Sequence, residues 1–105
     1  MASPTKEAKE HKKKVDSLTQ KIRDEAFRAR ERGDYVKTLS LFDEALSVDL
    51  GDEEAWYGKG ELYEKLGRKK MAEDCYKKAL HLAEIKQNQF IISEAQEGLA
   101  RLRRL

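Results

Sequence analysis

The stretch WYGKGELYEKLGRKKMAEDCYKKA, residues 56–79, decides the fold of this chain. It lacks proline, and helix-forming residues such as Ala, Leu, Glu and Lys dominate it. Its large and small apolar residues recur three or four positions apart, a spacing that places them on one face of a helix. Gly67, near the middle, supplies the left-handed turn that ends a helix. The stretch therefore predicts two helices that pack as an antiparallel pair.

The chain repeats itself at an offset of 34 residues. Strict identities are few, but paired positions agree in size where two helices would touch. The clearest correspondences are Gly33 with Gly67, Phe42 with Tyr76, Ala45 with Ala79, and Leu46 with Leu80. Such a period predicts an array of helix pairs, each of which buries against its neighbour a face that it cannot bury alone.

Seven positions resemble the signature of the tetratricopeptide repeat: Trp56, Gly60, Tyr63, Gly67, Ala72, Tyr76 and Ala79. The small residues let two helix backbones approach closely, and the aromatic side chains fill the space around the contact. The resemblance covers about two-thirds of the chain, and it implies an all-α fold, a right-handed α–α superhelix of about five helices in antiparallel pairs. Two features depart from the family pattern: Lys59 stands where Leu is usual, and no proline follows the second helix.

Residues that can cap helices support the same division of the chain into helices. Ser17 with Gln20 predicts a capping box at the start of the first helix, and Asp34 and Asp52 predict caps for two later helices. The expected helices lie near residues 17–32, 35–49, 53–66, 69–86 and 89–104. Residues 1–16 form either a basic N-terminal arm or an extension of the first helix, and both interpretations stay open at this point. The repeat domain is expected at 17–105, with repeats at about 19–52 and 53–86 and a capping helix at about 89–104.

The last segment leaves the 34-residue register, because Glu94 would fall on a small buried position and its charge opposes burial. Its apolar residues are instead spaced three to four apart: Ile91, Ala95, Gly98, Leu99, Leu102 and Leu105. This stripe predicts a helix that covers the second repeat as a cap. Phe90, Ile91 and Ile92 in succession exceed what one helix face can bury, so a dimer contact or the docking place of a further repeat is a second expectation.

The resemblance implies that the first helix of each pair lines an inner, concave face. The partner-binding residues expected there are Arg23, Phe27, Arg30, Tyr57, Glu61 and Glu64, with Glu31 and Lys65 beside them. Two aromatic side chains between arginine and glutamate suit an extended peptide or an amphipathic helix of a protein partner. The implied function is that of a scaffold or adaptor. The alternative is that Phe27 and Tyr57 only pack internally.

The charge pattern leaves a second class of function open. The chain is 39% apolar and 40% charged, and its net charge of +2 excludes a globally basic nucleic-acid binder. Basic residues nevertheless gather at Lys12–Lys14 and Arg101–Arg104. A basic arm of this kind touches phosphates in nucleic-acid-binding proteins, although a solvated tail is the commoner role. Nucleic-acid association is therefore the alternative function, together with self-association through the last helix.

Signals for chemistry are weak in this sequence. No nucleophile–base pair, phosphate-cradling loop or dinucleotide motif occurs, so we expect no enzyme and no cofactor. Cys75 and His81 lie six positions apart on different sides of a helix, and we expect no metal site. One cysteine cannot form an intramolecular disulfide, which favours a reducing, cytoplasmic location. No apolar run approaches the roughly 20 residues that span a bilayer.

Some members of the tetratricopeptide family bind a partner's C-terminal carboxylate through a Lys/Asn/Arg clamp. Arg23 matches the first basic residue of that clamp, but Phe27 and Gly58 stand where the clamp has Asn. We therefore predict that a peptide ending in Glu-Glu-Val-Asp does not bind with low micromolar affinity, as measured by fluorescence polarisation. A low micromolar Kd for that peptide contradicts the prediction.

Overall fold

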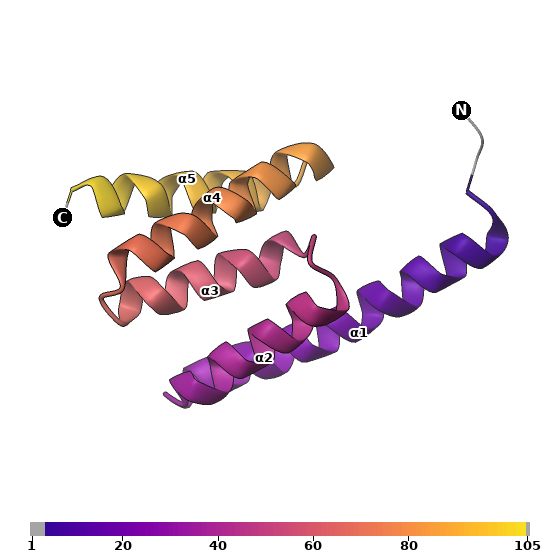
Figure 1. The fold of residues 1–105 in the computed structure, drawn as a ribbon, viewed down its shortest axis with the longest axis horizontal. Helices are drawn as coiled ribbons and strands as arrows, with labels where there is room; N and C mark the ends of the chain where they lie inside the picture. The colour runs from indigo at the N-terminus through magenta and orange to yellow at the C-terminus, as the bar shows by residue number, and fades with distance from the viewer. Residues whose placement is uncertain (1–3, 105) are drawn as a thin grey trace.

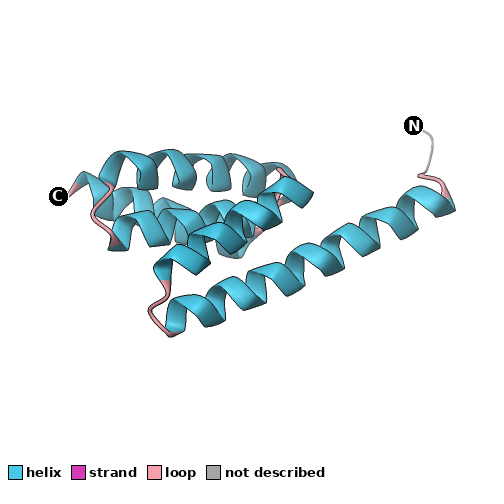
Figure 2. Ribbon diagram, turned by 60° about the horizontal axis from the view of Figure 1, so that its bottom comes forward, coloured by secondary structure: helices cyan, strands magenta, loops and turns pink. Residues whose placement is uncertain are grey.

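The computed structural model describes residues 4–104, and these residues form five helices joined by short turns (Figure 1). The helices are α1 (Lys6–Glu31), α2 (Tyr35–Val48), α3 (Glu53–Lys65), α4 (Lys69–Lys86) and α5 (Gln89–Arg103). Figure 2 shows only helix and loop over this range. The predictions of an all-α fold and of five helices are confirmed.

The turns between helices use the residues that the sequence singled out. Gly33 and Gly67 have φ values of 79° and 76°, the left-handed conformation that ends α1 and α3. Asp34 accepts a hydrogen bond from the backbone of Lys37, and Asp52 caps α3 in the same way. The turn before α5 has no glycine, and Gln87 adopts the left-handed conformation there with φ 60°.

The start of α1 differs from the expectation. The helix begins at Lys6, and the Thr5 side chain caps it by accepting a hydrogen bond from the Ala8 N–H at 3.1 Å. The capping box at Ser17 and Gln20 is therefore wrong, because no proline or glycine interrupts the helix-forming residues before it. The first half of α1 extends beyond the other helices (Figure 1), and residues 1–3 and Leu105 lie outside the described range.

The core is built from aromatic rings that rest on glycines. The Tyr76 ring of α4 lies between Gly60 of α3 and Gly98 of α5; a Cβ atom on either glycine would come within 2.7 Å of that ring. One repeat earlier, the Phe42 ring of α2 lies on Gly58 of α3 in the same way. Both rings are completely buried. The close helix approach at Gly60 agrees with the expectation. Gly58 and Gly98 allow the same close approach between α2 and α3 and between α4 and α5.

Two expected core positions are less enclosed than predicted. Leu18 lies four positions before the buried Ile22, a spacing that predicts a core position, but it is 47% exposed, because α1 leaves the other helices at this point and Thr19 is its first buried residue. Trp56 is half-buried, and its indole N–H donates to the Leu50 carbonyl at 2.9 Å. Beside it Lys59 replaces the usual Leu: its Nζ pairs with the Asp43 carboxylate at 2.7 Å and lies 5.3 Å from the Trp56 ring centroid.

The glycine contacts predict the effect of Gly60→Ala. An alanine inside a helix ordinarily stabilises it by up to about 1 kcal/mol relative to glycine. Here the new methyl group would overlap the Tyr76 ring, and we expect a net loss of about 1–3 kcal/mol in the free energy of unfolding. Urea denaturation followed by circular dichroism measures it. Gly51→Ala is the control, since its Cβ would meet Asp49 Oδ1 at an ordinary 3.4 Å. An equal or greater stability of Gly60→Ala contradicts the prediction.

Candidate partner-binding surface

A hollow of about 370 Å³ opens on the face formed by α1, α3 and α5. We call it the inner hollow, and its lining residues are Phe27, Arg30, Glu54, Tyr57, Glu61, Phe90 and Ile91. Four of the six residues expected to bind a partner lie here, namely Phe27, Arg30, Tyr57 and Glu61. The structure thus brings together residues from two repeats and adds a contribution from the capping helix.

Phe27 and Tyr57 both pack internally and line the inner hollow. The Phe27 ring meets the buried Phe42 ring edge-on, with centroids 5.4 Å apart. The Tyr57 ring lies 5.8 Å from the Tyr76 ring at a tilt of 40°. Each ring remains half-buried rather than enclosed. The two interpretations left open by the sequence therefore describe the same side chains, whose contacts with the core hold them in place at the hollow.

Charged groups of both signs border the inner hollow. Arg30 pairs with Glu61 at 2.7 Å, and its guanidinium lies 5.1 Å from the Phe27 ring centroid, a cation–π contact. The Tyr57 hydroxyl donates to Glu94 Oε2 at 3.2 Å. Burial, followed by the negative charges of Glu61 and Glu94, raises the pKa of Tyr57 well above its ordinary value. The phenol therefore stays protonated and can act as a hydrogen-bond donor at neutral pH.

Three lining residues were not expected on this surface, namely Glu54, Ile91 and Phe90. Phe90 is the aromatic one among them. It is 68% exposed, whereas its neighbour Ile91 is only 3% exposed and anchors α5 to the core. Consecutive residues of a helix point about 100° apart, so burial of Ile91 turns Phe90 outward to the rim of the hollow. The run of three apolar residues was a usable signal, but only the position of α5 beside α3 shows that Phe90 and Ile91 line the hollow and Ile92 does not.

The structure does not bring Arg23 and Glu64 to the inner hollow. Arg23 Nη1 pairs with Asp52 Oδ2 at 2.6 Å and so links α1 to the start of α3. Glu64 accepts a hydrogen bond from the Tyr76 hydroxyl at 2.6 Å and two from Arg101 at 3.1 Å. Both side chains join helices to one another, so their charges are already compensated within the chain.

A second, more polar hollow of about 440 Å³ adjoins the first. It is lined by Arg30, Glu31, Gly33, Tyr35, Glu61 and Lys65. Arg30 and Glu61 line both hollows, so the two hollows are neighbours that share this ion pair. The expected neighbours Glu31 and Lys65 therefore lie on the same surface as Phe27 and Tyr57, at its polar end.

Other kinds of site find little support in residues 4–104. No three or more His, Cys, Asp or Glu side chains in that range are grouped so that they could hold a metal ion. Cys75 is buried, and burial raises the pKa of its thiol, which keeps it protonated and unreactive. Within the same described residues, no helix combines the length and apolar character that a membrane crossing requires.

Comparison with known proteins points to one family. The sequence model described as tetratricopeptide repeat matches residues 53–84, which are α3, most of α4 and the turn between them. A crystal structure of a tetratricopeptide repeat domain protein from Salinibacter ruber is similar to this chain, with a TM-score of 0.77 and 25% sequence identity. The similarity covers 83% of this chain and 97% of that one. No curated protein matches the chain.

The contacts of Glu64 predict a pH-dependent contribution to stability. Hydrogen bonds from Arg101 lower the pKa of Glu64 below its ordinary value of 4.5, against the opposing effect of burial. Stabilisation by the carboxylate is therefore present above about pH 4.5 and is lost as the pH falls through the lower pKa of the folded state.

We expect Glu64→Gln to reduce the free energy of unfolding by about 1 kcal/mol at neutral pH, a modest value because Arg101 is partly exposed. The difference from the unmodified protein should shrink as the pH falls through the lowered pKa of Glu64, where the carboxylate itself becomes protonated. Urea denaturation across this pH range measures both values. A difference that is constant with pH contradicts the prediction.

Proposed function

We propose that this chain, which belongs to the tetratricopeptide-repeat family, is an adaptor that binds a segment of another protein in the inner hollow. Repeats of this family are generally protein–protein interaction modules and are typically not enzymes. A shared fold does not identify a partner, so the proposal is argued from the residues of the surface itself.

One observation carries the proposal. Phe27, Tyr57 and Phe90 come from three different helices and line a single hollow of about 370 Å³. The rings of Phe27 and Tyr57 are held by contacts with buried aromatic rings, so little side-chain freedom is lost when a partner binds. Aromatic and arginine side chains in a depression are the usual carriers of interface energy.

The lining residues indicate the kind of segment that fits. An apolar side chain of the partner would contact Phe27, Tyr57 and Phe90, and polar groups beside it would meet the Arg30–Glu61 pair. The second, more polar hollow beyond that pair leaves room for the partner's chain to continue past it. An extended peptide or one face of an amphipathic helix has this character. Because Arg30 and Glu61 neutralise each other, we expect the apolar contact to dominate affinity.

Self-association through α5 stays a separate prediction. The surplus of apolar residues at the start of α5 reduces to Phe90, since Ile91 is buried and Ile92 is half-buried. Phe90 lines the inner hollow, and binding of a partner there accounts for its exposure without a dimer. A cytoplasmic location likewise stays a prediction that rests on the single cysteine.

The proposal is tested by affinity capture from an extract of the source organism, quantified by mass spectrometry. Phe90→Ala is the main variant, because its side chain is 68% exposed and its removal leaves the core intact. We expect recovery of the partner to fall about tenfold, the effect of losing an aromatic side chain that contacts the partner. Phe27→Ala/Tyr57→Ala should reduce it at least as much.

Val36→Ala is the matched control, since Val36 is 84% exposed on α2 and lies outside the hollow. It should leave recovery unchanged. Circular dichroism of all variants checks that helical content is kept. If the inner-hollow variants keep their fold and none of them changes recovery of the partner, the proposal is wrong.

A further inference from the structure

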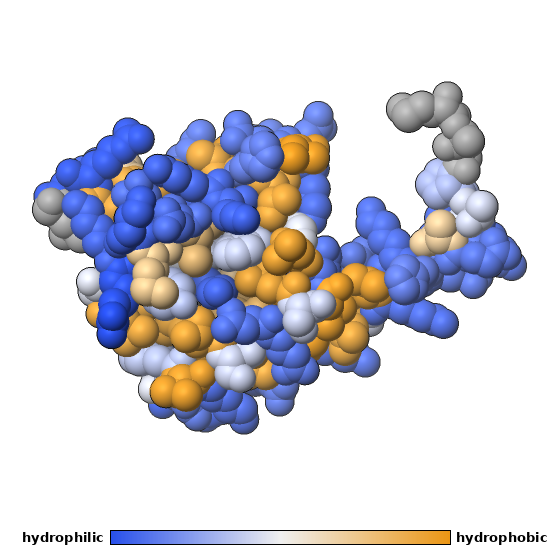
Figure 3. Space-filling view, in the orientation of Figure 1, coloured by the Kyte–Doolittle hydropathy of each residue, from blue (hydrophilic) through white to orange (hydrophobic). Residues whose placement is uncertain are grey.

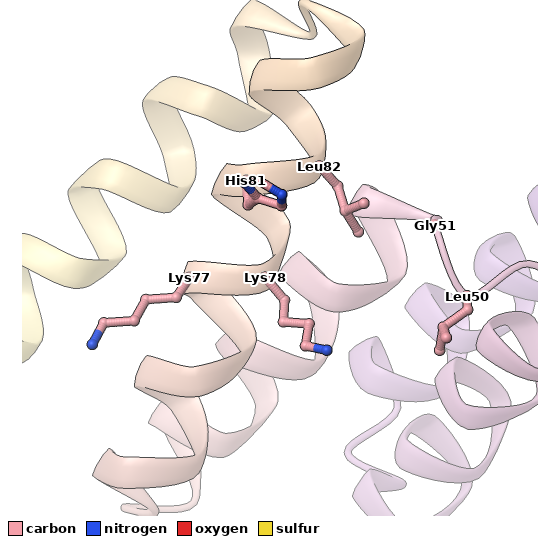
Figure 4. A pocket seen from close by; sticks show the side chains of 6 residues that line it. All are labelled: Leu50, Gly51, Lys77, Lys78, His81 and Leu82. Atoms are coloured by element: carbon pink, nitrogen blue, oxygen red, sulfur yellow. The ribbon is translucent and has the colours of Figure 1, made fainter.

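We propose a second binding surface, on a different face, that accepts an acidic segment of a partner protein and takes one aliphatic side chain into a pocket. This outer hollow has a volume of about 480 Å³ and lies between α4 and the turn that joins α2 to α3. Its lining residues are Leu50, Gly51, Lys77, Lys78, His81 and Leu82 (Figure 4). It shares no residue with the inner hollow, so this proposal does not depend on the adaptor function proposed for the inner hollow.

The walls of the outer hollow are apolar and open to solvent. Leu50 is 68% exposed, and Figure 4 shows Leu82 pointing from α4 toward the turn that carries Leu50 and Gly51. Ile85, one helical turn beyond Leu82, is 67% exposed. Figures 1 and 3 show the face of the molecule on which α2 lies in front of α1 and α4 in front of α5. Apolar surface gathers near the middle of this face in Figure 3. Exposed apolar surface that gathers in this way marks interaction sites.

The turn that forms one wall is held rigidly. The Trp56 indole donates to the Leu50 carbonyl at 2.9 Å, and the Gly51 N–H donates to Asp49 Oδ1 at 3.0 Å. Lys86 Nζ also donates to the Gly51 carbonyl. These bonds keep Leu50 at the solvent-exposed wall although it is apolar. A preformed wall lowers the ordering cost of binding, as at the inner hollow.

The charged residues of the outer hollow indicate what kind of partner segment binds there. Every ionisable residue that lines the outer hollow is basic, and none is a carboxylate. Lys77 points away in Figure 4 and pairs with Glu73 at 2.8 Å. Lys78 has no ion-pair partner among residues 4–104; its ammonium lies 5.1 Å from the Trp56 ring centroid. Its uncompensated positive charge beside an apolar pocket favours a carboxylate next to an aliphatic side chain.

A peptide suits this geometry better than a membrane or a nucleic acid. An anionic bilayer is bound by apolar side chains that project into it, whereas Leu82 here lines a depression. Nucleic-acid affinity comes from several phosphate contacts, and Lys78 is the one lysine of the lining without a carboxylate partner among residues 4–104. A depression with one free ammonium matches a short acidic segment with a leucine or isoleucine.

The test uses short fluorescein-labelled peptides whose central residue is Leu or Ala and whose flanking residues are all Glu or all Lys. In polarisation titrations with the intact protein, we expect the Glu-flanked Leu peptide to bind at least about fivefold more tightly than the other three, a difference of about 1 kcal/mol. Leu50→Ser/Lys78→Glu should remove this preference.

Two controls separate this surface from others. Val36→Ser/Lys13→Glu replaces an exposed aliphatic residue by Ser and an exposed Lys by Glu elsewhere on the surface, and it should keep the preference, as should Phe90→Ala in the inner hollow. Equal binding of all four peptides overturns the proposal, as does a preference that survives Leu50→Ser/Lys78→Glu. It is also overturned if only phosphatidylserine vesicles or duplex DNA bind in a manner sensitive to that variant.

Discussion

The Tyr76 ring, lying between Gly60 and Gly98, is the contact on which the rest of the structure depends. It brings α3, α4 and α5 to distances that no residue with a Cβ atom at either glycine would allow. Its hydroxyl donates to Glu64, which Arg101 of α5 also holds, so the same three helices are joined at both ends of the side chain. Steric fit and charge-assisted hydrogen bonds therefore specify one arrangement of these helices.

That arrangement produces a thin stack with a hollow on each of two faces. The molecule measures 47 × 29 × 18 Å, and its shortest dimension is less than two helix diameters. Residues on α1, α3 and α5 meet at the inner hollow, while α4 and the turn before α3 form the outer hollow. Because each helix pair is covered by the next, side chains from distant parts of the sequence become neighbours on these faces.

Many charged residues of this chain connect helices rather than face a partner. Arg23 with Asp52, Lys59 with Asp43 and Lys86 with Glu53 each join two helices or a helix and a capping residue. At Lys59, burial alone would lower the pKa of the ammonium group, but the hydrogen bond and charge of Asp43 outweigh it and raise that pKa. A lysine can therefore occupy a position where the family usually has leucine.

The local features of this protein were determined by the sequence itself: the five helices and the left-handed turns at Gly33 and Gly67. They depend on residues close together along the chain, whose spacing can be read directly. The tertiary structure alone decided that Phe90 joins Phe27 and Tyr57, and that Arg23 and Glu64 bond within the chain. These outcomes depend on how far α5 and α1 are rotated and shifted against α3, and a shift of one residue turns a helical side chain by about 100°.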